Sequence, residues 1–324
     1  MRINQLRELH PLMADTVKIG TRGSKLALWQ ANWVKSTLET HHPSLKAELV
    51  IIKTKGDKIL DVPLAKVGGK GLFVKEIEDA LLNSHIDIAV HSMKDMPAEI
   101  PDGLCIGAVP ERETPYDVLI SKKGQPLAGL KAGACVGTSS LRRAAQILHA
   151  RPDLVIKTLR GNLDTRLKKL ENEDYDAIIL AAAGVKRLGL ESRITEYLDE
   201  NIMLPAVGQG ALCVEIRQND QRIDSIVEAL EHPQTRSVVM GERAFLKRLE
   251  GGCQVPMAAH GKIEDNTFTL CGLVATVDAT TVIRETLSGD KDSAEAIGLQ
   301  LAERLISRGA QEIIETLTAD LNQE

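Results

Sequence analysis

The sequence predicts an α/β protein with two α/β units of similar size followed by a small α+β unit. Short β-branched runs alternate with amphipathic helical stretches, and this alternation occurs twice before about residue 210. The last third of the chain changes to alternating strand-like runs. The 324 residues include 43% hydrophobic and 26% charged residues, a globular balance that excludes disorder as the main state.

The first unit combines three strand-like runs with two helical stretches. The strands are expected at 17–20, 48–53 and 87–92, and the helices at 24–40 and about 72–83. This βαβαβ order is typical of a mainly parallel sheet. Leu26, Trp29 and Trp33 share one face of the first helix, so they are expected to pack into the core, as Phe73 is in the second helix.

The second unit repeats the pattern. Strands are expected at about 116–121, 134–138, 154–159 and 176–184, with helices that begin at Ser140 and around Leu163. The uncharged run at 176–184 is typical of a fully buried strand. A strand-like run at 210–217 follows a Pro-Ala-Val-Gly-Gln-Gly turn, and we expect it to return to the sheet of the first unit.

The third unit has a helix at about 235–249 that ends in two glycines. Three alternating runs at 257–263, 268–277 and 280–287 predict a small antiparallel sheet, and a charged helix begins near Ser293. The expected domains are therefore 15–110 with 211–228, then 111–210, and finally 229–324. The last of these carries the loop around Cys253.

Composition and missing motifs exclude several function classes. A net charge of −5 and only two Trp, three Tyr and three Phe argue against a nucleic-acid-binding protein. The longest uncharged apolar run has nine residues, and the first sixteen residues contain no signal-like core, so we expect a cytoplasmic protein without a membrane partner. The GK[ST] ending of a P-loop, the dinucleotide fingerprint, HExxH and GxSxG are all absent.

Five cysteines occur without any CxxC pair, and the eight histidines show no metal-ligand spacing, so we expect no metal. Cys105, Cys135, Cys213 and Cys271 lie in apolar runs and are expected to be buried. Cys253 differs because it follows two glycines and precedes a proline in EGGCQVP. A thiol on such a loop is either a reactive group or a tolerated surface cysteine.

Many basic residues fall at junctions between strands and helices, where open α/β sheets bind ligands. These residues are Arg22, Lys70, Lys94, Arg142, Arg143, Arg160, Arg166 and Arg187. Thr138, Ser139 and Ser140 add hydroxyl groups next to two guanidinium groups, which is typical of an anion-binding site. The pattern predicts a ligand with several carboxylates or phosphates.

Asp95 is an acid within this basic set, directly after Lys94 in HSMKD. It is either a local salt-bridge or cap residue, or an acid/base group that serves a cationic centre on an anionic substrate. The surrounding basic residues favour the second interpretation. His91, in the same motif, is expected to pack or to form a local hydrogen bond.

Eight motifs are similar, in order from about Val17 to the C-terminus, to the porphobilinogen deaminase (hydroxymethylbilane synthase) family. They are TRGS at 21–24, GGKG at 68–71, HSMKD at 91–95, VGTSSLRR at 136–143, LRGNLDTR at 159–166, KRLGLESR at 186–193, LPAVGQGA at 204–211 and LEGGCQVP at 249–256. About fifteen residues precede the first expected strand and lie outside the resemblance.

The resemblance implies two α/β domains hinged like a periplasmic-binding protein, plus a small C-terminal α+β domain. It implies an enzyme that joins four porphobilinogen molecules head to tail, releases ammonia and yields hydroxymethylbilane. A dipyrromethane cofactor would be attached through a thioether to Cys253, Asp95 would be the catalytic acid, and the basic residues would bind carboxylates. Matching the motifs also places Ser24, Ser92 and Gln209 among the binding residues, and the protein is expected to be a monomer.

The chemistry of this substrate agrees with the residues. Porphobilinogen carries an acetate and a propionate, so each added ring brings two negative charges that cationic side chains would hold. Loss of ammonia leaves an electron-poor azafulvene, and attack by a pyrrole creates a cation that Asp95 could stabilise. The alternative is a non-catalytic bilobed binding protein for a small carboxylate ligand, which would explain the arginines but neither Cys253 nor Asp95.

Overall fold

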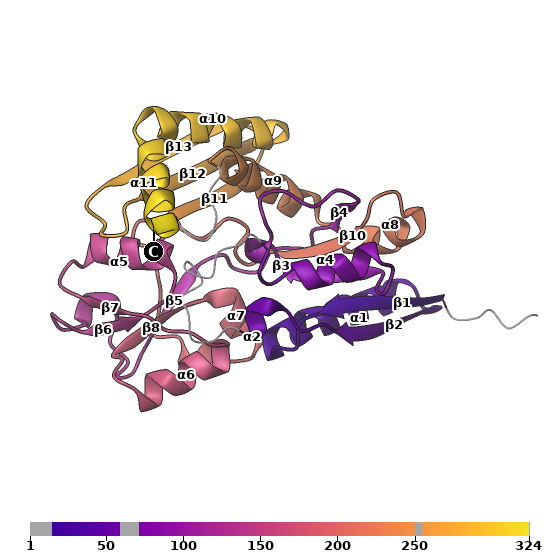
Figure 1. The fold of residues 1–324 in the computed structure, drawn as a ribbon, viewed down its shortest axis with the longest axis horizontal. Helices are drawn as coiled ribbons and strands as arrows, with labels where there is room; N and C mark the ends of the chain where they lie inside the picture. Colours follow the sequence, from indigo (N-terminus) through magenta and orange to yellow (C-terminus); the bar gives the residue numbers. More distant parts are fainter. Residues whose placement is uncertain (1–14, 59–70, 250–254, 324) are drawn as a thin grey trace, which may run out of the picture.

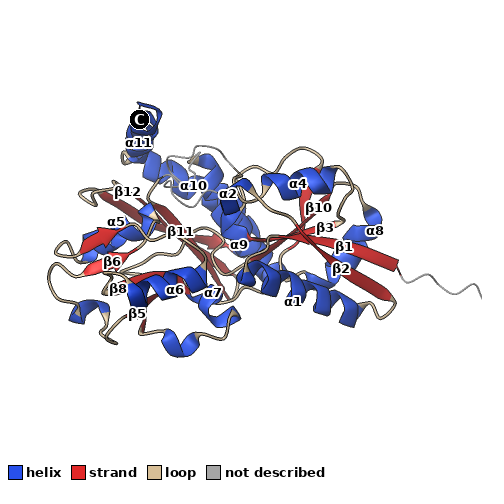
Figure 2. Cartoon of the chain, turned by 60° about the horizontal axis from the view of Figure 1, so that its bottom comes forward, coloured by secondary structure: helices blue, strands red, loops and turns tan. Residues whose placement is uncertain are grey.

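The computed structural model describes residues 15–58, 71–249 and 255–323. Two larger α/β lobes lie side by side along the long axis, and a smaller third unit packs against them (Figures 1 and 2). Each part is built around its own sheet. Within the described ranges, the helices are too short or too polar to cross a bilayer.

The first lobe is built on a five-stranded sheet with the order β2-β1-β3-β10-β4. Its strands are β1 (Asp15–Thr21), β2 (Leu45–Ile51), β3 (Ile88–Ser92), β4 (Leu104–Ala108) and β10 (Leu212–Arg217). β1 pairs in parallel with β2 and β3, whereas β10 runs antiparallel between β3 and β4. The expected return of the 210–217 run to the first sheet is therefore confirmed.

Four α-helices belong to the described part of this lobe. They are α1 (Lys25–His41), α2 (Lys55–Lys58), α4 (Lys75–Leu82) and α8 (Gln221–Val227), with the 3-10 turns η1 (Met93–Asp95) and η4 (Glu228–Leu230). α1 begins where it does because Ser24 caps it: its Oγ accepts a hydrogen bond from the Ala27 N–H at 3.2 Å.

The expectation that Trp29 and Trp33 lie in the core is wrong. Each is 37% exposed, because α1 buries a different face of the helix, formed by Gln30, Ala31, Val34 and Leu38. The centre of the Trp29 ring instead lies 5.7 Å from the guanidinium carbon of Arg187 in the second lobe. Phe73 precedes α4 and also lies outside the core, next to the cavity described below.

The second lobe has a sheet with the order β7-β6-β8-β5-β9. Its elements are β5 (Asp117–Ser121), η2 (Leu127–Gly129), β6 (Cys135–Gly137), α5 (Leu141–Ala150), β7 (Val155–Lys157), α6 (Leu163–Asn172), β8 (Ala177–Ala181), α7 (Ala182–Arg187), η3 (Glu191–Arg193) and β9 (Glu196–Tyr197). The strand predicted at 176–184 is too long. It ends at Ala181, and the small residues that follow form the start of α7, where Gly184 packs closely against Leu26 and Leu163.

The two sheets share one topology. In the spatial order of each sheet, the first three strands are parallel: β2-β1-β3 in the first lobe and β7-β6-β8 in the second. The fourth strand, β10 or β5, follows a crossing between the lobes and runs antiparallel to its neighbour. β5 follows the crossing from β4, and β10 follows the crossing from β9. This double crossing confirms the predicted class of two periplasmic-binding-protein-like α/β lobes.

The third unit is an antiparallel sheet of β11 (Met257–Glu264), β12 (Thr267–Ala275) and β13 (Val282–Asp290). α9 (Pro233–Arg248), η5 (Lys291–Ser293), α10 (Ala294–Ser307) and α11 (Ala310–Gln323) complete it. Phe245 and Phe268 are fully buried at its centre, and a Cβ at Gly241, Gly261 or Gly272 would lie 2.7 Å from one of their rings.

The cysteine prediction is correct for only one of the four residues assigned to the core. Cys213 is fully buried in β10, and burial raises the pKa of its thiol far above the ordinary value. Cys105, Cys135 and Cys271 are partly exposed. Cys253 and Lys70 lie outside the described residues.

Candidate active site

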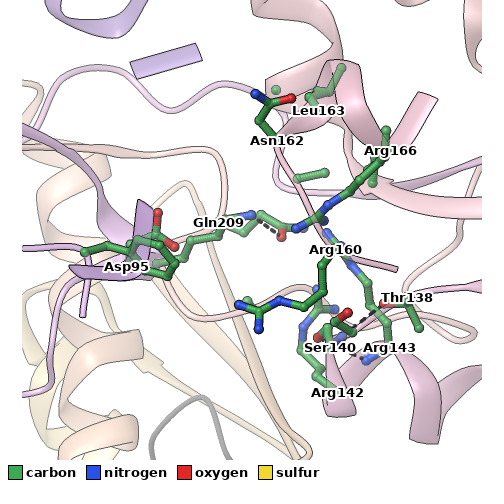
Figure 3. A pocket seen from close by; sticks show the side chains of 18 of the residues that line it. Asp95, Thr138, Ser140, Arg142, Arg143, Arg160, Asn162, Leu163, Arg166 and Gln209 are labelled. Carbon is green, nitrogen blue, oxygen red and sulfur yellow. Dashed lines mark hydrogen bonds between the residues drawn. The ribbon is translucent and has the colours of Figure 1, made fainter. Parts of the chain in front are cut away.

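A cavity of about 1150 Å³ is lined by residues of both lobes and of the third unit. The first lobe contributes Asp95, the second lobe contributes Arg160 and Arg166, and α9 of the third unit contributes Arg243. Figure 3 shows Asp95 on one side of this space and the arginines of the second lobe on the other. The cavity therefore brings together side chains that lie far apart in the sequence.

Most of the candidate residues from the sequence line this cavity: Arg22, Ser24, Lys94, Asp95, Thr138, Ser139, Ser140, Arg142, Arg143, Arg160, Arg166 and Gln209. Ser92 and Arg187 are not among the lining residues. The Oγ of Ser92 accepts a hydrogen bond from Gln30 Nε2 at 3.0 Å, and Arg187 Nη2 donates to the Gly210 carbonyl at 2.8 Å.

Asp95 ends the 3-10 turn that follows β3. The N–H of Met93 donates to the Ala211 carbonyl at 3.0 Å, and the N–H of Met96 donates to the Met93 carbonyl at 3.1 Å, so backbone bonds hold the turn on both sides. The Asp95 side chain is exposed to the cavity. Among the described residues, no hydrogen bond or ion pair engages its carboxylate, so the structure does not favour a local salt bridge or cap.

Lys94 lies next to Asp95 and directs its Nζ to Gln209 Oε1, at 3.4 Å. Burial, followed by the nearby Arg143 guanidinium, lowers the pKa of Lys94 to about 8, although Asp95 and Asp117 act in the opposite direction. Lys94 is therefore a cation whose charge depends on pH near neutrality.

Arg142 and Arg143 share one carboxylate at the start of β5. Arg142 Nη1 lies 2.7 Å from Asp117 Oδ2, and Arg143 Nη2 lies 2.7 Å from Asp117 Oδ1. Burial alone would raise the pKa of Asp117, but the two guanidinium groups hold it well below the ordinary value. This partner of the two arginines was not identified in the sequence, and it neutralises part of their charge.

The hydroxyl groups of 138–140 are also engaged locally. Ser140 caps α5 by accepting a hydrogen bond from the Arg143 N–H, and Thr138 Oγ1 accepts one from the Ser140 N–H at 3.1 Å. Ser139 Oγ donates to the Leu159 carbonyl at 2.7 Å. These three residues shape the cavity wall at the start of α5.

The positive charges of Arg160 and Arg166 are less compensated than those of Arg142 and Arg143, which share the Asp117 carboxylate. The Nη1 of Arg160 is buried and has no hydrogen-bond partner among the described residues. Arg166 Nε donates to the Gly161 carbonyl at 2.8 Å, and burial lowers the pKa of Arg166 to about 10, with Arg143 and Arg160 adding to the effect and Asp95 opposing it. An unpartnered guanidinium nitrogen in a basic cavity indicates an anionic ligand.

Arg22 forms part of the cavity wall of the first lobe. Its guanidinium carbon lies 4.2 Å from the centre of the Phe73 ring, a stacked arrangement that limits the directions in which the arginine can point. Phe73 lines the cavity as well. Phe73 was expected in the core, and its position shortly after the GGKG motif was the available signal for a role at the cavity.

The residues within the described ranges offer no cluster of three or more His, Cys, Asp or Glu side chains that could hold a metal ion. Two carboxylates line the described part of the cavity, Asp95 and Asp164, and Asp164 pairs with Lys25 at 2.9 Å. Asp95 is thus an exposed acid without an ion pair to any described residue, among several cationic groups. Such a site can bind a ligand with several carboxylates and place a negative charge next to one part of it.

The two family matches and the most similar curated proteins agree on one family. Residues 17–225 match the family described as "Porphobilinogen deaminase, dipyromethane cofactor binding domain", and residues 237–307 match "Porphobilinogen deaminase, C-terminal domain". The porphobilinogen deaminase of Syntrophotalea carbinolica is 56% identical over 94% of this chain and 97% of the relative. That of Carboxydothermus hydrogenoformans is 53% identical over 96% of this chain and 100% of the relative.

A solved structure with a similar arrangement is a TRAP periplasmic solute binding protein from Desulfovibrio salexigens. It aligns with a TM-score of 0.42 and 10% identity, over 67% of this chain and 71% of that chain.

Proposed function

The chain belongs to the porphobilinogen deaminase family, and we propose that it joins four porphobilinogen molecules head to tail into hydroxymethylbilane with release of ammonia. The observation that carries this proposal is that one cavity is lined both by Asp95, whose carboxylate is exposed, and by Arg160, whose buried Nη1 has no hydrogen-bond partner among the described residues. A growing chain of pyrroles carries carboxylates on every ring and a transient positive charge at the ring that reacts.

The residues of the cavity fit the dipyrromethane cofactor that the family description names. That group consists of two linked pyrrole rings with four carboxylates, and the cavity of about 1150 Å³ offers both space and cationic groups. We propose that Cys253 holds it covalently and that Arg143, Arg160 and Arg166 face its carboxylates. When bound, the cofactor supplies a fixed pyrrole end to which substrate units can be added.

The chain's own residues would then act on the substrate. The arginines and Lys94 would bind the acetate and propionate groups and fix the orientation of the ring. Asp95 would accept hydrogen bonds from pyrrole N–H groups, balance the positive charge that forms after ammonia leaves, and take the proton released when two rings join. The remaining candidates Arg22, Ser24, Thr138, Ser139, Ser140, Arg142 and Gln209 would line the binding site, and Lys70, Ser92 and Arg187 would support it.

Several further features belong to this proposal. The domain boundaries 15–110 with 211–228, 111–210 and 229–324 would separate the two lobes and the third unit. The protein would act as a cytoplasmic monomer on a small-molecule substrate, without a nucleic-acid or membrane partner.

The test combines intact-mass measurement with an assay of ammonia and hydroxymethylbilane. The purified protein should carry a covalent addition with the mass of two linked pyrrole units and should release ammonia from porphobilinogen. Cys253→Ser should lack the addition, whereas Asp95→Ala should keep a folded chain but lose nearly all turnover. Carboxylate binding by a wild-type protein that has neither an addition nor turnover would support the binding-protein alternative instead.

A further inference from the structure

The position of Asp95 depends on backbone contacts, because its side chain has no partner among the described residues. At the start of the turn that carries Asp95, the N–H of Met93 donates a hydrogen bond to the Ala211 carbonyl. The segment that follows, from Met96 to Ala98, leaves the sheet and lines the cavity with Asp95. Whatever fixes this segment also fixes the direction in which the Asp95 carboxylate points.

Arg243 of α9 is the side chain that binds this segment. Its Nη2 donates to the Pro97 carbonyl at 2.9 Å and to the Ala98 carbonyl at 3.1 Å, two and three residues after Asp95. Only 5% of Arg243 is exposed, although the residue also lines the cavity. A buried guanidinium bonded to two successive carbonyls allows the segment little freedom.

The environment of Arg243 compensates only part of the cost of burying its charge. Burial lowers the pKa of Arg243, while Cys213 and Glu215 of β10 act in the opposite direction. Since the described structure gives Arg243 no ion pair, the carbonyls of Pro97 and Ala98 are its main partners. Removing the guanidinium would leave these two carbonyls without their donor.

α9 also connects Arg243 to the segment that contains Cys253. The helix ends at Arg248, five residues after Arg243, and Cys253 follows five residues later in the sequence. A single helix therefore binds the segment after Asp95 at one point and leads into the proposed cofactor loop at its end.

We propose that Arg243 is a positioning residue. By binding the segment after Asp95 from helix α9, it fixes the position of the Asp95 carboxylate next to the reacting ring. This inference rests on the proposed function. It assigns no contact between Arg243 and substrate: the guanidinium acts through the Pro97 and Ala98 carbonyls. A displacement of a catalytic group by about 1 Å can reduce a rate about 100-fold, so loss of this contact is expected to lower turnover strongly.

Arg236 provides a matched control on the same helix. It lies seven residues earlier, two turns along the same face, and its Nη2 donates to the Gly107 carbonyl of the first lobe at 2.9 Å. Both arginines thus join α9 to backbone carbonyls of the first lobe. They differ in that Arg236 contacts β4, away from the Asp95 segment, and also forms an ion pair with Glu231.

The experiment compares Arg243→Leu, Arg243→Lys and Arg236→Leu in the cofactor-loaded enzyme, with kcat, KM and melting temperature measured for each. Arg243→Leu should lower kcat by about 10- to 100-fold with KM changed less than about twofold, and Arg243→Lys should restore part of the loss. Arg236→Leu should lower the melting temperature by a similar amount but keep kcat close to wild type.

Three outcomes would overturn the proposal. A rise in KM at constant kcat would make Arg243 a substrate ligand, and an equal loss of kcat in Arg236→Leu would reduce its role to stability. If Arg243→Leu does not fold, Arg243→Lys decides: a wild-type kcat in that variant would contradict the expected partial loss and show that the guanidinium is not needed to place Asp95. Failure of the proposed function itself would be seen separately, as absence of hydroxymethylbilane in the wild-type reaction.

Discussion

Arg112, in the segment that crosses from β4 to β5, forms a bidentate ion pair with Glu242 of helix α9. Arg112 Nη1 lies 2.7 Å from Glu242 Oε1, and Nη2 lies 3.2 Å from Oε2. Glu242 is fully buried and also accepts hydrogen bonds from the N–H groups of Gly208 and Gly261. One carboxylate therefore joins both crossings between the lobes to the third unit.

Replacing Glu242 should destabilise the protein strongly. Glu242→Gln leaves the Arg112 guanidinium buried without its counter-charge, and breaking such a pair costs about 3–5 kcal/mol. Urea unfolding should show this loss in the free energy of unfolding. Glu303→Gln is the control, because Glu303 pairs with Arg248 on the surface and an exposed pair contributes about 1 kcal/mol or less. Equal effects of the two variants would contradict this account of Glu242.

Arg143 and Arg160 should respond differently to replacement by leucine. Arg143→Leu removes one of the two counter-charges of the buried Asp117, so it should lower stability by about 3 kcal/mol or more as well as activity. Arg160→Leu removes a guanidinium whose Nη1 has no described partner, so it should lower activity and leave the melting temperature nearly unchanged. Thermal unfolding together with the profile of elongation intermediates separates the two; similar melting losses would refute the distinction.

The activity should fall at alkaline pH because Lys94 loses its positive charge there. Its pKa is lowered to about 8, so the free enzyme loses this positive charge as the pH rises through that value. Because a neutral amine holds a substrate carboxylate less well, kcat/KM for porphobilinogen should fall above about pH 8. The guanidinium introduced by Lys94→Arg stays charged over this range, so that variant should show a flatter profile between about pH 7 and pH 9. Identical alkaline limbs in the two enzymes would exclude Lys94 as the cause.

The sequence predicted the class of the fold because the class depends on local patterns. Periodicity located most strands of the two lobes but not β4 or β9, and the turn before residue 210 correctly indicated a strand that returns to the first sheet. The face of a helix that becomes buried was harder to predict. Trp29 and Trp33 suggested an apolar face, but α1 packs on the sheet through smaller residues and leaves both indoles partly exposed, that of Trp29 next to Arg187 of the second lobe.

The basic and hydroxyl residues at strand–helix junctions predicted much of the cavity wall, because parallel strands bring their ends to one edge of a sheet. The pairing of those residues is tertiary and was not visible. Asp117 lies 25 residues before Arg142, at the start of a strand with no marker of its function. Arg243 has the appearance of an ordinary helical arginine, and only the packing of α9 on the first lobe brings it to the Asp95 segment.

Two buried glutamates, Glu78 of α4 and Glu215 of β10, lie close to His91 in β3, the strand that leads to Asp95. His91 Nε2 lies 3.0 Å from Glu215 Oε2, which confirms the expected local hydrogen bond of His91. One carboxylate oxygen each of Glu78 and Glu215 has no hydrogen-bond partner among the described residues. Burial, followed by the charge of Glu215, raises the pKa of Glu78 to about 7, although His91 opposes the shift.

Glu78 should therefore make the protein less stable as the pH rises. Its pKa in the folded protein lies above the unfolded value, so the folded state binds the extra proton, and stability falls from about pH 4.5 until Glu78 is ionised above about pH 7. Between about pH 5 and pH 8 this loss amounts to about 2 kcal/mol. Glu78→Gln, which cannot ionise, should melt higher than wild type at pH 8 but not at pH 5. Asp102→Asn removes an exposed carboxylate of the same lobe that is not among the charges acting on Glu78, and it should leave the pH dependence of melting close to that of wild type. If Glu78→Gln lost stability in parallel with wild type across this range, the proton would reside on Glu215 or His91 instead.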